Sequence, residues 1–136
     1  MGTYEIDSWL NHQITRHFHA SEFRCRCDAS CCNARPIEHE LVRRLQILRD
    51  RLRLASGVEI RMIVNSGSRC EFWNAQVDGK ANSFHLRGMA ADIQVRDDYT
   101  RYLMVRYGAE LFSGIGVGDD FVHFDIRPAK PVMWTY

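Results

Sequence analysis

The chain has 136 residues, of which 46% are hydrophobic and 26% are charged, a composition typical of one globular domain. Its 18 basic and 17 acidic residues leave a net charge of +1, which argues against a dedicated duplex nucleic-acid binder and against a disordered chain. The five cysteines cannot all pair within one chain, which argues against a secreted disulfide scaffold. We therefore expect a single domain over residues 1–136.

The strongest helix signal follows a stretch of about 35 residues that shows no clear periodicity. Pro36 suits the first turn of a helix, Asn33 offers a nearby cap, and Gly57 is placed to end the helix. Apolar residues recur at helical spacing through this segment: Ile37, Leu41, Leu45, Leu48 and Leu52. The pattern predicts one long helix with a buried stripe.

The rest of the chain predicts mainly strands with short helices. We expect strands over 58–64, 90–95 and 122–126, helices over 71–77 and 98–107, and a turn over 65–68. Glycines at 114, 116 and 118 indicate a short strand and a turn, and Pro128 and Pro131 are expected to end regular structure. This order favours an α+β fold with a central antiparallel sheet and packed helices.

Two of the expected strands carry polar residues on one face only. Side chains alternate between the faces of a strand, so Asp92 lies opposite the apolar face of the strand over 90–95. By the same alternation His123 and Asp125 share the face opposite Val122 and Phe124. If the two strands are neighbours in one sheet, Asp92 and His123 meet on its open face.

A third candidate metal ligand precedes the first of these strands. His85 ends a polar loop, and Gly88 permits a tight bend that would bring His85 beside Asp92. Two neutral imidazoles and one carboxylate form a common shell for a catalytic zinc, whose fourth position holds water. The alternative is that each histidine is a hydrogen-bonded residue without a metal. The pattern predicts one Zn²⁺ held by His85, Asp92 and His123.

The motifs around these residues resemble those of the zinc D-Ala-D-Ala carboxypeptidase family, which includes VanY-type peptidoglycan peptidases. Residues 83–92 follow its Ser-x-His-x6-Asp pattern, His123 supplies the later histidine, and residues 66–69 match its Ser-Gly-x-Arg. The early string HFHASEFRCRC and the last segment with Trp134 resemble the branch of small phage and bacterial members. The resemblance covers most of the chain.

This resemblance implies the small α+β fold shared with hedgehog signalling domains and a zinc peptidase that acts on peptidoglycan stem peptides. Arg69 would bind a carboxylate or carbonyl of the substrate, since a guanidinium grips a planar carboxylate in bidentate fashion. A structural ion pair is the alternative for Arg69. Ser83 would donate to the substrate or brace the His85 loop, and Trp134 is the best candidate for a wall of the cleft.

Two carboxylates compete for the role of general base, which passes a proton from water to the leaving amine. Asp120 lies three residues before His123, as Glu or Asp does in members of the family, and we favour it as the base. Asp125 would then support the site by accepting a hydrogen bond from a ligand histidine. If Asp120 merely belongs to a Gly-Asp-Asp turn, the two roles are exchanged.

Four cysteines lie close together in the sequence, at positions 25, 27, 31 and 32. Their spacing lacks the two-residue to four-residue gaps of common zinc knuckles, so we expect reduced thiols that pack a loop. The alternatives are a structural metal bound by Cys25, Cys27, Cys31 and Cys32, and a local disulfide that involves Cys70.

The leading functional hypothesis is an endopeptidase of phage endolysin or phage tail type. The alternatives are a D,D- or L,D-carboxypeptidase that trims the terminal D-Ala, and a non-catalytic zinc-binding recognition module. The N-terminus lacks the features of a signal peptide, and no apolar run is long enough to span a membrane. We expect a monomer without nucleic-acid or membrane partners. It would be made in the cytoplasm and act on the bacterial cell wall after holin-type release or within a phage particle.

Overall fold

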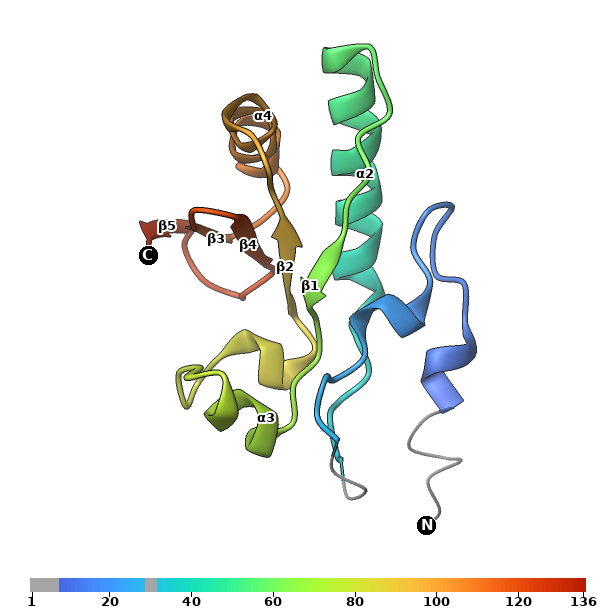
Figure 1. Ribbon diagram of the computed structural model, residues 1–136, viewed down its shortest axis with the longest axis vertical. Helices are drawn as coiled ribbons and strands as arrows, with labels where there is room; N and C mark the ends of the chain where they lie inside the picture. The colour runs from blue at the N-terminus through green and yellow to red at the C-terminus, as the bar shows by residue number, and fades with distance from the viewer. Residues whose placement is uncertain (1–7, 29–31) are drawn as a thin grey trace.

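The computed structural model describes residues 8–28 and 32–136 (Figure 1). Its centre is a sheet of five strands in the order β1-β2-β4-β3-β5. The strands are β1 (Val64–Ser66), β2 (Ala90–Gln94), β3 (Gly114–Val117), β4 (Phe121–Asp125) and β5 (Val132–Thr135). The helices are η1 (Ser8–Asn11), η2 (Ala20–Phe23), α2 (His39–Ser56), α3 (Glu71–Gln76), η3 (Phe84–Arg87) and α4 (Asp98–Gly108), where η marks a 3₁₀-helix. The predicted α+β class is confirmed.

Helices α2 and α4 pack on the apolar face of the sheet. The expected stripe of α2 is buried at every position, and it shares one core with Met104 of α4, Ile93 of β2 and Phe124 of β4. In Figure 1, α2 runs beside β1, whereas α3 and the segment containing η3 lie at the opposite end of the strands from α4. The polar face of β2 and β4 is left open to carry side chains with chemical functions. No helix among the described residues has the length and apolar character needed to cross a membrane.

The start of α2 differs from the prediction. The helix begins at His39 with Glu38 as its N-cap, so the expected cap at Asn33 and first turn at Pro36 are wrong. The N–H of Glu38 donates to the carbonyl of Gly88 at 2.8 Å, which ties the segment before the helix to the turn after η3. Gly88 has a φ of 70°, and a Cβ there would come within 2.2 Å of the Pro36 carbonyl oxygen. This close approach, rather than helix propensity, fixes the path of the chain.

The first strand is shorter and later than the predicted strand over 58–64. Val64 pairs with Ile93 and Ser66 with Asp92, and the N–H of Gln94 donates to the carbonyl of Ile63. Strand β2 ends at Gln94, so the residues before Ile63 have no partner strand to extend the ladder.

The sequence reasoning missed β5. Pro131 lies immediately before this strand, where its missing N–H removes no ladder hydrogen bond. Strand β5 pairs in parallel with β3, with Gly116 opposite Trp134, so the sheet is mixed rather than wholly antiparallel. The consequence is that Trp134 enters the structure on an edge strand of the same sheet as His123.

Candidate metal centre and substrate cleft

The register of β2 against β4 places the two strand-borne candidates side by side. The strands are antiparallel and Asp92 lies directly opposite His123, as the alternation predicted. Ile93 and Phe124 are fully buried on the other face, so the register is fixed by the core beneath.

Helix η3 delivers His85 to the same place. The hydroxyl of Ser83 accepts a hydrogen bond from the N–H of His85 and so caps the helix. The imidazole is buried, and its Nδ1 lies 2.7 Å from the carbonyl oxygen of Gly67. Because a carbonyl only accepts, Nδ1 carries the proton and donates it to Gly67. The lone pair of Nε2 therefore points toward Asp92, in the tautomer that a metal ligand needs.

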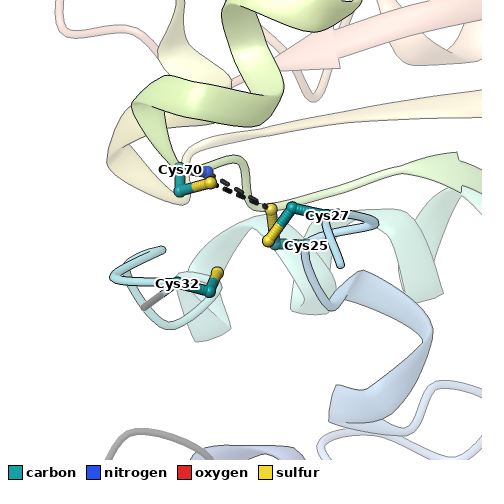
Figure 2. Close-up of side chains that lie close together, drawn as sticks. All are labelled: Cys25, Cys27, Cys32 and Cys70. Carbon is teal, nitrogen blue, oxygen red and sulfur yellow. Dashed lines mark hydrogen bonds between the residues drawn. The ribbon is translucent and has the colours of Figure 1, made fainter. Parts of the chain in front are cut away.

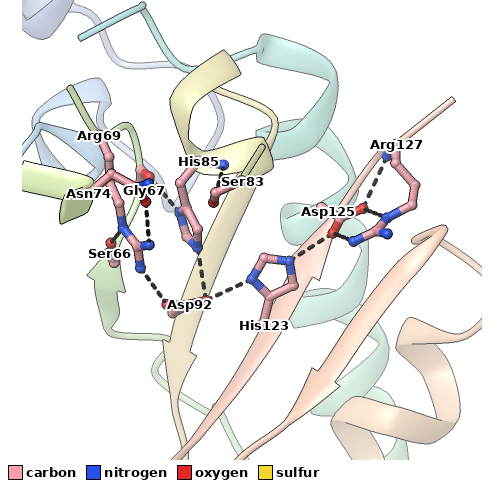
Figure 3. A network of polar contacts seen from close by, with 10 residues as sticks. All are labelled: Ser66, Gly67, Arg69, Asn74, Ser83, His85, Asp92, His123, Asp125 and Arg127. Carbon is pink, nitrogen blue, oxygen red and sulfur yellow. Dashed lines mark hydrogen bonds and ion pairs between the residues drawn. The ribbon is translucent and has the colours of Figure 1, made fainter. Parts of the chain in front are cut away.

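The three predicted ligands converge on one point (Figure 3). Oδ1 of Asp92 lies 3.1 Å from Nε2 of His85 and 2.9 Å from Nδ1 of His123. One ligand atom from each residue lies within 4.8 Å of the other two. A tetrahedral zinc with arms of about 2.0–2.1 Å separates its ligand atoms by about 3.3–3.4 Å. The donor set and its spacing fit a zinc ion.

Asp125 fixes the orientation of His123 through the ring nitrogen that does not face Asp92. Its fully buried carboxylate lies 2.7 Å from Nε2 of His123 and forms a bidentate pair with Arg127, at 2.8 Å from Nε and 2.7 Å from a terminal nitrogen. Burial raises the pKa of Asp125, but hydrogen bonds from Arg127 and His123 outweigh it and hold the pKa below its usual range. The ionised carboxylate accepts the Nε2 proton of His123, so the Nδ1 lone pair faces Asp92.

Arg69 is anchored by protein groups on the opposite side of Asp92. Its guanidinium donates to Oδ2 of Asp92 at 3.2 Å, to the hydroxyl of Ser66 at 3.0 Å and to the amide oxygen of Asn74 at 3.2 Å. A guanidinium has five N–H donors, so these contacts leave about two of them for another ligand. The ion pair and the substrate-binding role, which the sequence left as alternatives, are therefore compatible.

A cleft of about 670 Å³ lies over the three ligands. Its lining includes Arg69, Ser83, His85, Asp92, His123 and Trp134, which is every predicted ligand and substrate-binding residue. The ring centroid of Trp134 is 5.3 Å from that of His123, so the indole forms a wall beside the candidate metal.

Other residues of this region were missed by the sequence reasoning. The guanidinium of Arg127 lies 4.7 Å from the ring centroid of Phe84 and 5.0 Å from that of Trp134, so it is held between two aromatic rings. Alternation continued past the end of β4 places Arg127 on the face of His123, but the sequence reasoning gave this residue no role. Asp78 and Tyr136 also line the cleft, and no motif pointed to either.

The structure does not bring Asp120 into this network. It is exposed in the bend before β4, its carbonyl accepts from the N–H of Val95 at 2.9 Å, and the lining of the cleft does not include it. Its assignment as general base stays a prediction. Asp125 provides the support that the sequence suggested, but its burial behind His123 keeps it out of the cleft.

A family model described as Peptidase M15 matches residues 16–125. This span includes His85, Asp92, His123 and Asp125. A comparison with curated proteins finds no match.

Proposed function

This chain belongs to the Peptidase M15 family, and on that premise we propose that it hydrolyses amide bonds in the stem peptides of peptidoglycan. The family is one of zinc-dependent peptidases that act on peptidoglycan-like substrates. The observation that carries the proposal is the convergence of His85, Asp92 and His123 at the floor of a cleft, with both imidazoles held in the tautomer that presents a lone pair. We also propose that the chain belongs to a branch of small phage-type enzymes within this family.

The proposed metal ligands are His85, Asp92 and His123. A zinc ion with three protein ligands and one open position acts as a Lewis acid and provides an activated water nucleophile at neutral pH. The protein's own contribution is to hold the ligands rigidly: Gly67 fixes one imidazole and Asp125 fixes the other.

The proposed substrate contacts are Arg69, Ser83 and Trp134. The unused N–H groups of Arg69 would bind a carbonyl or carboxylate of the stem peptide beside the reacting bond. The hydroxyl of Ser83 accepts from the N–H of His85 and retains its own proton, so it can donate to the substrate. The indole of Trp134 would pack against the apolar part of the peptide and exclude water from one side.

We propose two candidates for the group that moves the proton. Asp120 is supported by its spacing from His123, and Asp78 is supported by its place in the lining of the cleft. Separate Asp120→Asn and Asp78→Asn variants distinguish them, because loss of the base removes turnover while zinc stays bound. Wild-type activity in both variants would contradict both assignments.

The free donors of Arg69 also suit a terminal carboxylate, which favours a D,D- or L,D-carboxypeptidase as the second candidate. Digestion of purified peptidoglycan with and without a chelator, followed by mass spectrometry, separates the candidates. New amine ends within the stem peptide identify an endopeptidase, whereas loss of one terminal D-Ala identifies a carboxypeptidase. No product from the zinc-loaded protein would contradict the proposal and favour a recognition module. The place of action that we propose is the bacterial cell wall, reached by release from the producing cell or within a phage particle.

A further inference from the structure

Four cysteines that do not line the catalytic cleft lie close together (Figure 2). The sulfur atoms of Cys25, Cys27, Cys32 and Cys70 all lie within 4.8 Å of one another. The first two follow η2, Cys32 precedes α2, and Cys70 is the N-cap of α3. Cys31, which the sequence placed in this cluster, lies outside the described residues. The chain thus brings segments that are far apart in sequence to a common thiol site.

The distances fit a shared metal ion better than a covalent bond between Cys25 and Cys70. Their sulfur atoms are 3.7 Å apart. A disulfide requires about 2.05 Å. A tetrahedral zinc with arms of about 2.3 Å to sulfur has sulfur–sulfur edges of about 3.8 Å. The observed separation therefore matches one edge of a zinc tetrathiolate.

Backbone N–H groups are directed at the sulfur atoms. The N–H of Cys70 donates to Sγ of Cys25 at 3.4 Å, and the N–H of Trp73 donates to Sγ of Cys70 at 3.4 Å. Donors of this kind stabilise the negative charge of metal-bound thiolates. The buried position of Cys70 keeps that side of the cluster away from water, as in a closed structural site.

We propose that Cys25, Cys27, Cys32 and Cys70 bind a structural zinc ion, which is separate from the catalytic one. Four thiolates complete a tetrahedron and leave no open position, so this ion has a structural role. The sequence left a structural metal as an alternative, disfavoured it because of the unusual gaps between the cysteines, and sought all four ligands in the N-terminal segment. One of them instead comes from the start of α3.

The location of the site indicates what the ion stabilises. The N–H of Ser68, in the loop between β1 and α3, donates to the carbonyl of Phe23 at 2.9 Å. A Cβ on Gly67 of the same loop would come within 2.7 Å of the Phe23 Cα, so the N-terminal segment already contacts this loop. The same loop carries the carbonyl that orients His85, and it also carries Arg69. Zinc bound between the two segments would hold this loop, and with it one side of the catalytic site, in place.

Metal counting tests the proposal on the purified full chain. We expect the wild type to contain two zinc ions per chain. Cys70→Ser and Cys32→Ser should each contain one. His123→Ala should also contain one, but with all four thiols protected from alkylation until a chelator is added. The control is Cys31→Ser, which changes a neighbouring cysteine that the proposal does not use and should retain both ions.

Three results from metal counting and intact mass would overturn the inference. One is a wild type with one zinc whose content is unchanged in Cys70→Ser. Another is an intact mass that reveals a disulfide among the four cysteines. The third is loss of an ion from Cys31→Ser with none lost from Cys32→Ser, which would show that Cys31 binds the ion and Cys32 does not. If Cys70→Ser fails to fold, the thiol protection of His123→Ala still decides, because unprotected cysteines in that variant contradict the site. Activity is not the readout, so failure here is distinguishable from failure of the proposed peptidase function.

Discussion

Asp125 gives the sharpest prediction about the proposed catalytic metal, because it would act on the zinc only through His123. The change Asp125→Asn keeps the volume of the side chain and removes its charge. The side chain is fully buried, so water cannot replace the lost interaction. An amide nitrogen placed near Nε2 of His123 favours the opposite tautomer, which moves the proton to Nδ1 and blocks the lone pair that faces Asp92.

The expected size of the effect follows from the bond that is lost. The contact from Nε2 to the Asp125 carboxylate is short, at 2.7 Å, and hydrogen bonds to charged groups contribute about 1.5–3 kcal/mol. A loss of about 2 kcal/mol corresponds to about 30-fold weaker zinc binding. This lies within the range of about 10- to 100-fold found when groups that orient metal ligands are mutated.

The assay is competition for the catalytic zinc with a chelator of known affinity, with circular dichroism to confirm the fold. The matched control is Asp120→Asn, which makes the same chemical change in an exposed residue at the other end of the strand and should leave zinc affinity unchanged. Wild-type zinc affinity in Asp125→Asn would refute the reasoning that this carboxylate sets the tautomer of His123.

Three further predictions follow from packing and charge. Gly114→Ala places a Cβ 2.2 Å from an Asp125 oxygen, so we expect a loss of about 1–3 kcal/mol in unfolding free energy and weaker zinc binding; unchanged values in denaturant and zinc titrations would contradict this. Trp134→Ala should raise KM by a factor of about two to ten at unchanged zinc content, because stacking on the substrate contributes about 0.5–1.5 kcal/mol; an unchanged KM would contradict a contact between Trp134 and the substrate. Hydrogen bonds from Arg43 and Arg44 lower the pKa of Glu40 from 4.5 to about 2, so the small stability difference between the wild type and Glu40→Gln should be present at neutral pH and vanish as the pH falls toward 2. A stability difference that grows as the pH falls would contradict this prediction.

Local patterns predicted the parts of the fold that depend on periodicity. The buried stripe of α2 follows from helical spacing, and the meeting of Asp92 with His123 follows from alternation on two strands whose apolar faces share one core. Strand β5 could not be predicted in this way, because it is an edge strand with mostly exposed side chains and therefore lacks an apolar alternation. Its pairing depends on the position of β3.

The site was predictable where residue type alone sets the chemistry, and less so where contacts do. The spacing of His85 and Asp92 indicated a metal centre. The sequence favoured a supporting role for Asp125 over the role of base, but it kept the exchange of roles open, because the choice depends on burial and on the pair with Arg127. Cys70 illustrates the same limit, since its sulfur joins the N-terminal cysteines only through the packing of the loop before α3.

The central claim is that zinc held by His85, Asp92 and His123 is required for cleavage of peptidoglycan stem peptides. The most direct measurement is the rate of release of peptide fragments as the catalytic zinc is removed with a chelator and then restored. We predict that activity falls in proportion to occupancy of this site, returns with added zinc, and is absent in His123→Ala. Cleavage that persists without zinc at this site, or in His123→Ala, would contradict the account.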